Sequence, residues 1–351
     1  SKELSLSLSL NYHGGGIKVE ENASWVGLGW SLGTIPSISR QINGLADEVG
    51  GYHGNITYDG YSMKTIEDSV ISNSSEWWLE QFRQQIYYGQ VDPEADIYFF
   101  NLPGKSGKFW WNQETFSYQT YPKSEIKIEG GLGSFRITDE DGTIYDFFDY
   151  ETSQSSGSIA GPLVPSAWYA SKIYSANRTD SIEFVYSSSS TTFKTIAPYT
   201  LTVFGSCPSS DLGHTTSVSI KLPDSILFNN GYIKFTLQVS SRQDYNGGYA
   251  LDNVKVYNKG HEIIKQYNLS YYYLQSSDGG SFCNNAPSYE KKRLMLDGID
   301  LVDGNNFNPQ KHRFFYDSTI ISPCKVSTAQ DYWGFYNGKQ TNIDLIPKTA
   351  M

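Results

Sequence analysis

The chain has 351 residues, of which 27 are Lys or Arg and 37 are Asp or Glu, so its formal net charge is −10. This acidic balance argues against nucleic acid as a partner, because phosphate binding requires clustered Lys and Arg side chains. No apolar run approaches the roughly 20 residues that a membrane-spanning helix needs. The 27 Tyr residues and the 15% aromatic content favour an all-β protein of mainly antiparallel strands, in one curved sheet or in sandwich-like layers.

The first strand is expected at Leu4 to Leu10, where Leu and Ser alternate. Such alternation places one residue type on each face of a strand. No charged segment followed by an apolar run precedes it, so the sequence shows no secretory signal peptide. We expect a mature product or a fragment of a much longer chain.

The segment Tyr12 to Arg40 organises the N-terminal region, because Trp25, Gly27, Gly29 and Trp30 fall close together within it. Glycines beside large indole rings let the backbone bend and approach other segments closely. We predict a tight corner between two strands, filled by the two tryptophans. An ordinary strand with glycine bulges is the alternative.

Asp47 and Glu48 follow the turn at Asn43 and Gly44 and supply two carboxylates. Calcium requires six to eight oxygen ligands, so we interpret this pair as turn chemistry and predict no metal site.

Residues 75–88 form the one predicted helix, with a serine before its first turn and Gly89 after its last. Trp78, Phe82 and Ile86 share a face at helical spacing. We expect this amphipathic helix to cover a sheet. The alternative is a contact with a partner or a membrane surface.

Residues 104–108 read Gly-Lys-Ser-Gly-Lys and superficially resemble a phosphate-binding loop. A phosphate loop must open a helix after its lysine, whereas Phe109 begins an aromatic strand segment. We therefore predict a hairpin turn and no cofactor. A second hairpin turn is expected at Asp141 and Gly142.

Ser153 to Pro165 is rich in Ser, Gly and Pro, and is a candidate linker or long loop. It separates an N-terminal β region, residues 1–152, from an antiparallel β region, residues 166–351. Regular turn signals between residues 217 and 275 favour a meander of strands there.

Cys207, Cys283 and Cys324 are an odd number of widely spaced cysteines. They match no zinc-ligand spacing. One disulfide with one free thiol is open, and three thiols is the interpretation we favour.

The stretch Asp331 to Gly338 gathers four aromatic residues, including Trp333, around Gly334. Core packing around a glycine bend is the favoured interpretation, with stacking on sugar rings as the alternative. No HExxH metal motif or GxSxG nucleophile motif is present, so we predict a protein that is not an enzyme and name no catalytic residues. A hydrolase whose two carboxylates meet in space ranks last.

The sequence GLGWSL at residues 27–32, followed by a short β run ending at Arg40, resembles the opening of RHS/YD-repeat proteins. It is also similar to the SpvB-like region of Tc-toxin shell subunits, and its longer form resembles the very large RHS proteins of Bacteroidetes. Further pieces of that pattern follow in order, at Asp96 to Asn101, Ser106 to Phe109, Asp141 to Thr143, Ser166 to Tyr169, Lys292 to Leu294 and Asp331 to Gly338. No YD repeats occur, so the resemblance is to the region ahead of the repeats.

This resemblance implies a non-catalytic structural segment of a β-shell that encloses or presents a C-terminal effector or toxin domain. It further implies a secreted or cell-surface bacterial protein, exported through type IX secretion and its outer-membrane machinery. The partner would then be the remainder of its own chain. The alternative function is a surface adhesion or carbohydrate-binding module, whose partners would be glycans.

Overall fold

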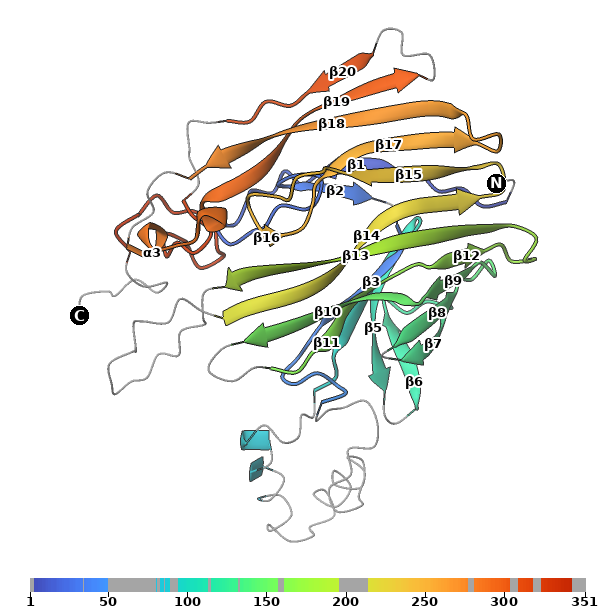
Figure 1. The fold of residues 1–351 in the computed structure, drawn as a ribbon. Helices are drawn as coiled ribbons and strands as arrows, with labels where there is room; N and C mark the ends of the chain where they lie inside the picture. The colour runs from blue at the N-terminus through green and yellow to red at the C-terminus, as the bar shows by residue number, and fades with distance from the viewer. Residues whose placement is uncertain are drawn as a thin grey trace. The chain divides into compact units, whose positions relative to one another are not determined.

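The computed structural model describes residues 3–33, 35–49, 80, 83–84, 86–88, 94–112, 115–131, 133–156, 161–195, 214–276, 281–303, 309–317 and 323–342. Strands dominate these residues, and neighbouring strands pair in antiparallel fashion (Figure 1). The prediction of an all-β, mainly antiparallel fold is confirmed.

The chain divides into two compact units. Unit 1 contains Ser1–Thr34, Ser153–Gly161 and Ile182–Met351, and unit 2 contains Ile35–Thr152 and Pro162–Ser181. This division differs from the sequential one that composition suggests, because the N-terminal residues pack with the C-terminal part of the chain. Strand residues also reach into the candidate linker from both sides, since β10 (Asp149–Ser156) enters it and β11 (Val164–Tyr169) starts within it.

Unit 1 is built on a long antiparallel meander. Its strands pair in the order β13, β14, β15, β17, β18, β19, β20. Their bounds are β13 (Ser181–Thr195), β14 (His214–Phe228), β15 (Gly231–Leu237), β17 (Leu251–Asn258), β18 (Ile263–Gln275), β19 (Lys292–Asp303) and β20 (Gln310–Arg313). The short strand β16 (Asn246–Gly247) pairs with β13, and β1 (Ser9–Tyr12) pairs with β2 (Trp30–Gly33). The predicted meander is confirmed.

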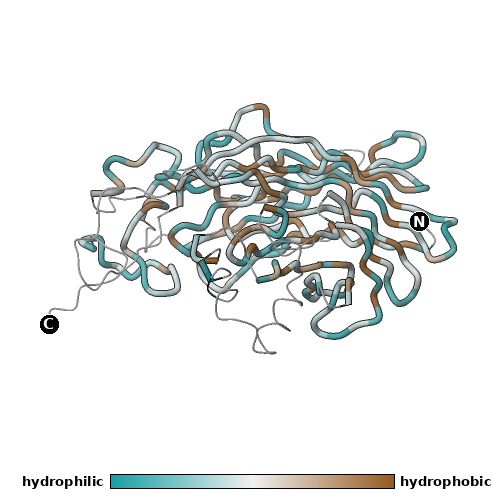
Figure 2. Tube along the Cα trace, turned by 90° about the horizontal axis from the view of Figure 1, so that it is seen from below, coloured by the Kyte–Doolittle hydropathy of each residue, from teal (hydrophilic) through white to brown (hydrophobic). Residues whose placement is uncertain are grey.

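The strands of the meander have one face packed against the core and one face exposed to solvent. Along β13, Ile182 and Phe184 are buried, whereas Glu183 and Val185 are exposed. Figure 2 shows the same alternation of hydrophobic and hydrophilic residues along strands. This period of two is expected where an antiparallel sheet is covered on one side only.

The core of unit 1 joins the two ends of the sequence. Ala23 and Leu28 pack with Ala250, Leu294 and Met295, and all five side chains are buried. Burial of apolar surface from both ends stabilises the N-terminal segment against β19.

Unit 2 contains two antiparallel series of strands. In the first, β11, β3, β4, β5 and β6 pair in that order, and in the second β7, β8, β9 and β12 do so. The bounds not yet given are β3 (Ser37–Gln41), β4 (Ile97–Leu102), β5 (Lys105–Asn112), β6 (Ser117–Tyr121), β7 (Lys127–Gly131), β8 (Ser134–Thr138), β9 (Ile144–Phe147) and β12 (Lys172–Tyr174).

The hairpin turn predicted at Asp141 and Gly142 is confirmed, whereas the turn predicted over residues 104–108 is confined to residues 103–104, because β5 already begins at Lys105. Gly104, with φ of 76°, lies between β4 and β5, and Gly142, with φ of 86°, lies between β8 and β9. Positive φ at these positions suits glycine.

Four aromatic rings form the centre of unit 2. Tyr98 stacks on Phe109 with ring centroids 5.1 Å apart, and Phe135 meets the Trp168 ring edge-on at 5.0 Å. Tyr98 also contacts Phe135 at 5.5 Å. Such pairs add a geometric preference to the burial of large apolar areas.

Most of the predicted helix at residues 75–88 lies outside the described residues. Glu80, Arg83, Gln84, Ile86 and Tyr87 have helical backbone, and the helix as a whole stays a prediction. Two short helical segments, α3 (Ser281–Asn284) and η1 (Ser288–Lys291), are additional. Within the described residues, no helix has the length and apolar character needed to cross a membrane.

Candidate functional site

The predicted corner is a chain of tight turns, and the corner and the segment before it bond to three distant segments of unit 1. Leu28 donates its backbone N–H to the Leu294 carbonyl oxygen at 2.8 Å, and the Trp25 carbonyl oxygen accepts from the backbone N–H of Leu251 at 2.9 Å. Before the corner, Val19 donates its backbone N–H to the carbonyl oxygen of Gly334 at 2.8 Å. The corner is therefore held by backbone hydrogen bonds as well as by packing.

Gly27 and Gly29 fill the roles that the sequence assigned to them. Both have positive φ, 113° and 75°. A Cβ atom on Gly27 would lie 3.0 Å from the backbone nitrogen of Leu296, and one on Gly29 would lie 2.9 Å from the Tyr12 ring. The two positions therefore require glycine for both conformation and space.

Arg242 clamps the start of the corner from the inside of unit 1. Its guanidinium donates to the carbonyl oxygens of Ser24 at 2.9 Å and Ala23 at 3.0 Å. It also forms a two-point ion pair with Asp244, at 3.0 Å and 2.7 Å. Both side chains are buried, so each charge is compensated by the other and by backbone dipoles.

Arg293, at the start of β19, binds the segment just before the corner. Its guanidinium donates to the carbonyl oxygens of Val19 at 2.7 Å and Glu21 at 3.0 Å. A third bond goes to the carbonyl oxygen of Pro323 at 3.3 Å. Burial lowers the pKa of Arg293 to about 10, which leaves the guanidinium charged at neutral pH. Together, Arg242 and Arg293 form what we term the arginine clamp.

Lys325 and Glu290 extend the arginine clamp with two further buried ionisable groups. Lys325 Nζ donates to the carbonyl oxygen of Asp244 at 2.5 Å and to Asn22 Oδ1 at 3.1 Å. Glu290 Oε2 lies 3.9 Å from the same Nζ atom. The side chains of Lys325 and Glu290 are 3% and 1% exposed, so both charged groups of this contact are shielded from solvent.

Burial shifts both of these groups toward their neutral forms. It lowers the pKa of Lys325 to about 8, despite the opposing effect of Glu290 and Asp244. It also raises the pKa of Glu290, with the cation of Lys325 opposing the shift. A low-dielectric environment disfavours charge on either group.

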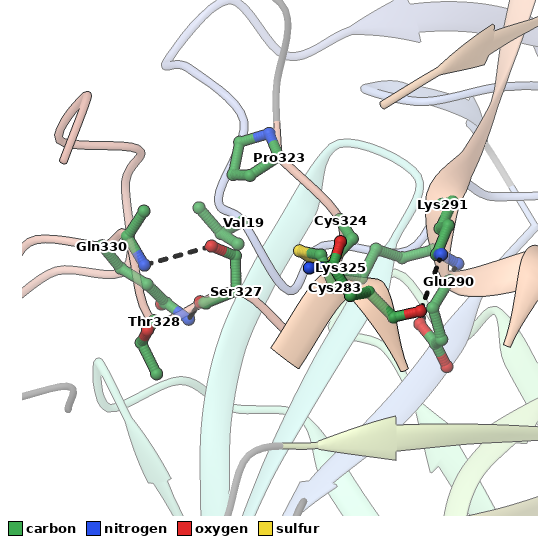
Figure 3. The surroundings of a disulfide bond; sticks show 12 residues. Val19, Cys283, Glu290, Lys291, Pro323, Cys324, Lys325, Ser327, Thr328 and Gln330 are labelled. Atoms are coloured by element: carbon green, nitrogen blue, oxygen red, sulfur yellow. Dashed lines mark hydrogen bonds and ion pairs between the residues drawn. A yellow bond between two sulfur atoms is a disulfide. The ribbon is translucent and has the colours of Figure 1, made fainter. Parts of the chain in front are cut away.

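A disulfide links Cys283 to Cys324, next to Lys325 (Figure 3). The two sulfurs and Ala286 and Val326 form a small buried cluster. The favoured interpretation of three free thiols is therefore wrong. The pairing depends on chain packing that spacing does not reveal. Cys207 lies outside the described residues.

An aromatic pocket lies beside the corner and encloses about 720 Å³. Leu274 of β18, Met295 of β19 and the charged Arg313 line part of it. The aromatic residues around it are Tyr12, Trp30, Tyr272, Phe314, Phe315, Tyr316 and Tyr336. Phe315 is 93% exposed, and Tyr12 and Tyr272 are partly exposed, so several rings present area to solvent.

Hydrogen bonds fix the orientation of two of the aromatic side chains that line this pocket, Trp30 and Tyr316. Trp30 donates from Nε1 to the Tyr316 hydroxyl at 2.7 Å, and that hydroxyl donates to the Leu296 carbonyl oxygen at 2.8 Å. The Trp30 ring also packs on Phe314 at 4.5 Å and on Tyr12 at 5.0 Å. The rings are therefore held in defined orientations before any ligand arrives. Trp25, by contrast, packs against Phe235.

In unit 2, Arg40 lies in a buried ionic cluster. It pairs with Asp96, and with Glu48 at 3.0 Å and 2.5 Å. Asp96 accepts the backbone N–H groups of Asn43 at 2.9 Å and Asp47 at 3.1 Å. The cluster thus ties the turn after β3 to the start of β4. Within the described residues, no group of three His, Cys, Asp or Glu side chains could hold a metal ion.

Asp47 carries the least compensated carboxylate of this cluster. Its Oδ1 accepts the Asp96 backbone N–H at 3.1 Å, while its Oδ2 has no hydrogen-bond partner among the described residues. Burial, and then the nearby Asp96 charge, raises the pKa of Asp47 to about 7.

Trp333 and Gly334 lie in the turn that bonds to the segment before the corner. Gly334 has φ of 89°, and its carbonyl is the acceptor for Val19 described above. Tyr332 and Trp333 are 96% and 70% exposed. Core packing was therefore the wrong interpretation for these two rings. The other two rings of the turn do face unit 1, since Phe335 lies against Gly16 and Tyr336 lines the aromatic pocket.

The sequence analysis did not find Arg242, Asp244, Glu290 or Lys325. Isolated charged residues look the same in a sequence whether they are solvated or buried. The one available signal in the sequence is the basic run Lys291 to Arg293, of which Arg293 is buried in the folded chain.

Comparison with protein-family models, with curated proteins and with solved structures finds no match to this chain.

Proposed function

We propose that this chain is a non-catalytic structural segment of a large secreted RHS-type protein, in which it forms part of a β-shell around a C-terminal effector. The observation that carries the proposal is the arginine clamp. Arg242 and Arg293 hold the N-terminal corner across sequence separations of 219 and 274 residues. A wall segment needs such ties, because buried hydrogen-bond networks rigidify the segments that they join.

The extended meander supports the same role. Strands β13, β14, β18 and β19 are 15, 15, 13 and 12 residues long, longer than the strands of most globular domains. Long strands with one solvent-exposed face suit the wall of a shell that borders solvent. The buried disulfide supports export, because disulfides persist mainly in oxidising compartments.

The test uses the natural full-length protein. If the chain is part of a closed shell, the C-terminal portion should resist protease in the intact protein and be cut rapidly once the shell is opened. The variant Arg293→Met should increase the rate of cleavage, whereas Arg313→Met, which removes an exposed ion pair to Asp300, should not. Equal cleavage of the C-terminal portion in intact and opened protein would rule out encapsulation.

The aromatic pocket favours a second candidate, a carbohydrate-binding module at the cell surface. Exposed aromatic rings stack on sugar faces, and hydroxyl and guanidinium groups that line the pocket can bond sugar hydroxyls. A glycan array with wild type and Phe315→Ala tests it. Tyr332→Ala is the matched control, since Tyr332 is equally exposed but outside the pocket. Binding that Phe315→Ala abolishes and Tyr332→Ala retains supports this function, and absence of binding to any glycan opposes it.

A further inference from the structure

The contact among Lys325, Asn22 and Glu290 brings together an amine, a carboxamide and a carboxyl group in the buried part of unit 1. Lys325 Nζ lies 3.1 Å from Asn22 Oδ1 and 3.9 Å from Glu290 Oε2. Because Oδ1 is bonded to Cγ, the electrophilic carbon of the carboxamide is one bond beyond this contact. We propose that Lys325 and Asn22 become joined by an isopeptide bond, with Glu290 as the proton-transfer group.

The surroundings suit an amine nucleophile. Lys325 Nζ lies 5.2 Å from the centre of the Tyr245 ring, and its side chain is 3% exposed. Arg242 and Arg293 place two cations nearby, while Asp244 and Glu290 place two carboxyl groups there. Desolvation outweighs the carboxyl groups and lowers the pKa of Lys325 to about 8, so a neutral amine is accessible near neutral pH.

Glu290 is placed to move protons in this contact. Its Oε1 accepts the backbone N–H of Lys194 at 3.4 Å, and its Oε2 has no hydrogen-bond partner among the described residues. Burial raises its pKa, which favours a protonated carboxyl beside the amine. A proton donor and acceptor of this kind is what an acyl transfer from an amide requires.

The reaction balances without any further reagent. Lys325 Nζ attacks Asn22 Cγ and forms the new C–N bond. The bond from Cγ to Nδ2 then breaks, and Nδ2 leaves as ammonia. Glu290 supplies the proton that the departing nitrogen needs and recovers one from Nζ, so it ends in its starting state. The product is an amide between residues 22 and 325.

Two restraints already hold the reacting groups in place. The Lys325 backbone N–H donates to the Glu290 carbonyl oxygen at 3.0 Å, and the adjacent Cys324 is fixed by its disulfide to Cys283 (Figure 3). On the other side, Arg293 binds the carbonyl oxygen of Glu21, next to Asn22. Fixing both partners in contact lowers the entropic barrier to a reaction between them.

The direct test is the intact mass of the purified wild-type protein after reduction and denaturation. A cross-linked chain should weigh less than the sequence mass by one ammonia molecule. Trypsin should then yield a branched peptide that joins residues 19–40 to the peptide containing Lys325, because an acylated lysine is not cleaved. A wild-type mass equal to the sequence mass would overturn the proposal, and this measurement needs no variant to fold.

Variants assign the roles of the three residues. Lys325→Met and Glu290→Gln should both restore the full sequence mass, and Asn22→Asp should change the loss from ammonia to water. Glu21→Gln is the matched control, since Glu21 neighbours Asn22 but bonds to Lys18, and it should keep the loss of ammonia. A loss that persists in Glu290→Gln would overturn the role of Glu290, and one that persists in Lys325→Met would overturn the bond itself.

Discussion

Arg293 donates a hydrogen bond of 2.7 Å to the carbonyl oxygen of Val19, a residue 274 positions earlier in the chain. The guanidinium is almost completely buried, and Val19 is fully buried beside it. The bond joins the first strand residues of β19 to the segment that leads into the glycine corner. The stability of unit 1 therefore depends on a contact between the two ends of the sequence.

Replacing this arginine should destabilise unit 1 strongly. Arg293→Met leaves two buried carbonyl oxygens and one part-buried carbonyl oxygen without their charged donor, and we expect a loss of about 3–5 kcal/mol in the free energy of unfolding. Urea denaturation followed by circular dichroism measures it. Arg313→Met removes an exposed ion pair and should cost less than about 1 kcal/mol. Equal losses of stability from the two substitutions would contradict the stabilising role of the arginine clamp.

Gly27→Ala tests the corner itself. The added methyl group would meet the Leu296 backbone at 3.0 Å in a residue with φ of 113°, so we expect a loss of about 2–3 kcal/mol. Gly14→Ala is the matched control, because a Cβ there meets nothing within 4 Å. A thermal melt of both variants measures the difference. A Gly27→Ala protein as stable as the control would show that the corner can relax.

Asp47 should make the stability of unit 2 depend on pH. Its folded pKa of about 7 exceeds the ordinary value of 3.8, so the folded chain retains a proton that the unfolded chain has released. Folding is then favoured at low pH, and the contribution of this group to stability falls as pH rises from about 4 to about 7.

Asp47→Asn should remove that dependence. The uncharged amide keeps an acceptor for the Asp96 backbone N–H, and we expect the variant to exceed wild type by roughly 1–3 kcal/mol at pH 8 and to match it near pH 4. Urea denaturation across this pH range provides the measurement. Glu48→Gln, which weakens a partner of Arg40, should instead lower stability at pH 8. Parallel curves for Asp47→Asn and wild type would refute the assignment.

Reduction of the disulfide should destabilise unit 1. Cys283 and Cys324 are 41 residues apart, and the chain-entropy model gives about 4 kcal/mol for a loop of that size. The free energy of unfolding should therefore fall when reductant is added. The Cys283→Ala/Cys324→Ala double variant should not respond to reductant. The loss should be larger in a Glu290→Gln background, where no second covalent tie holds residue 325.

Much of the local structure follows from the sequence alone. The turns at Gly104 and Gly142 and the alternation of buried and exposed residues along β13 depend on neighbours a few residues apart. Turn chemistry and a period of two act over that range, so they can be read without knowing the fold. The need for glycine at position 27 is only partly local, because the Leu296 backbone that lies close to it comes from a distant strand.

The arginine clamp, the disulfide pairing and the contact of Lys325 with Asn22 were decided by tertiary structure. Each joins residues that are tens to hundreds of positions apart, and no local pattern distinguishes a buried lysine from a solvated one. The aromatic turn at Tyr332 and Trp333 makes the same point in reverse, since these two rings of a dense aromatic run stay exposed. Burial of a side chain depends on what packs against it, and only the folded chain determines that.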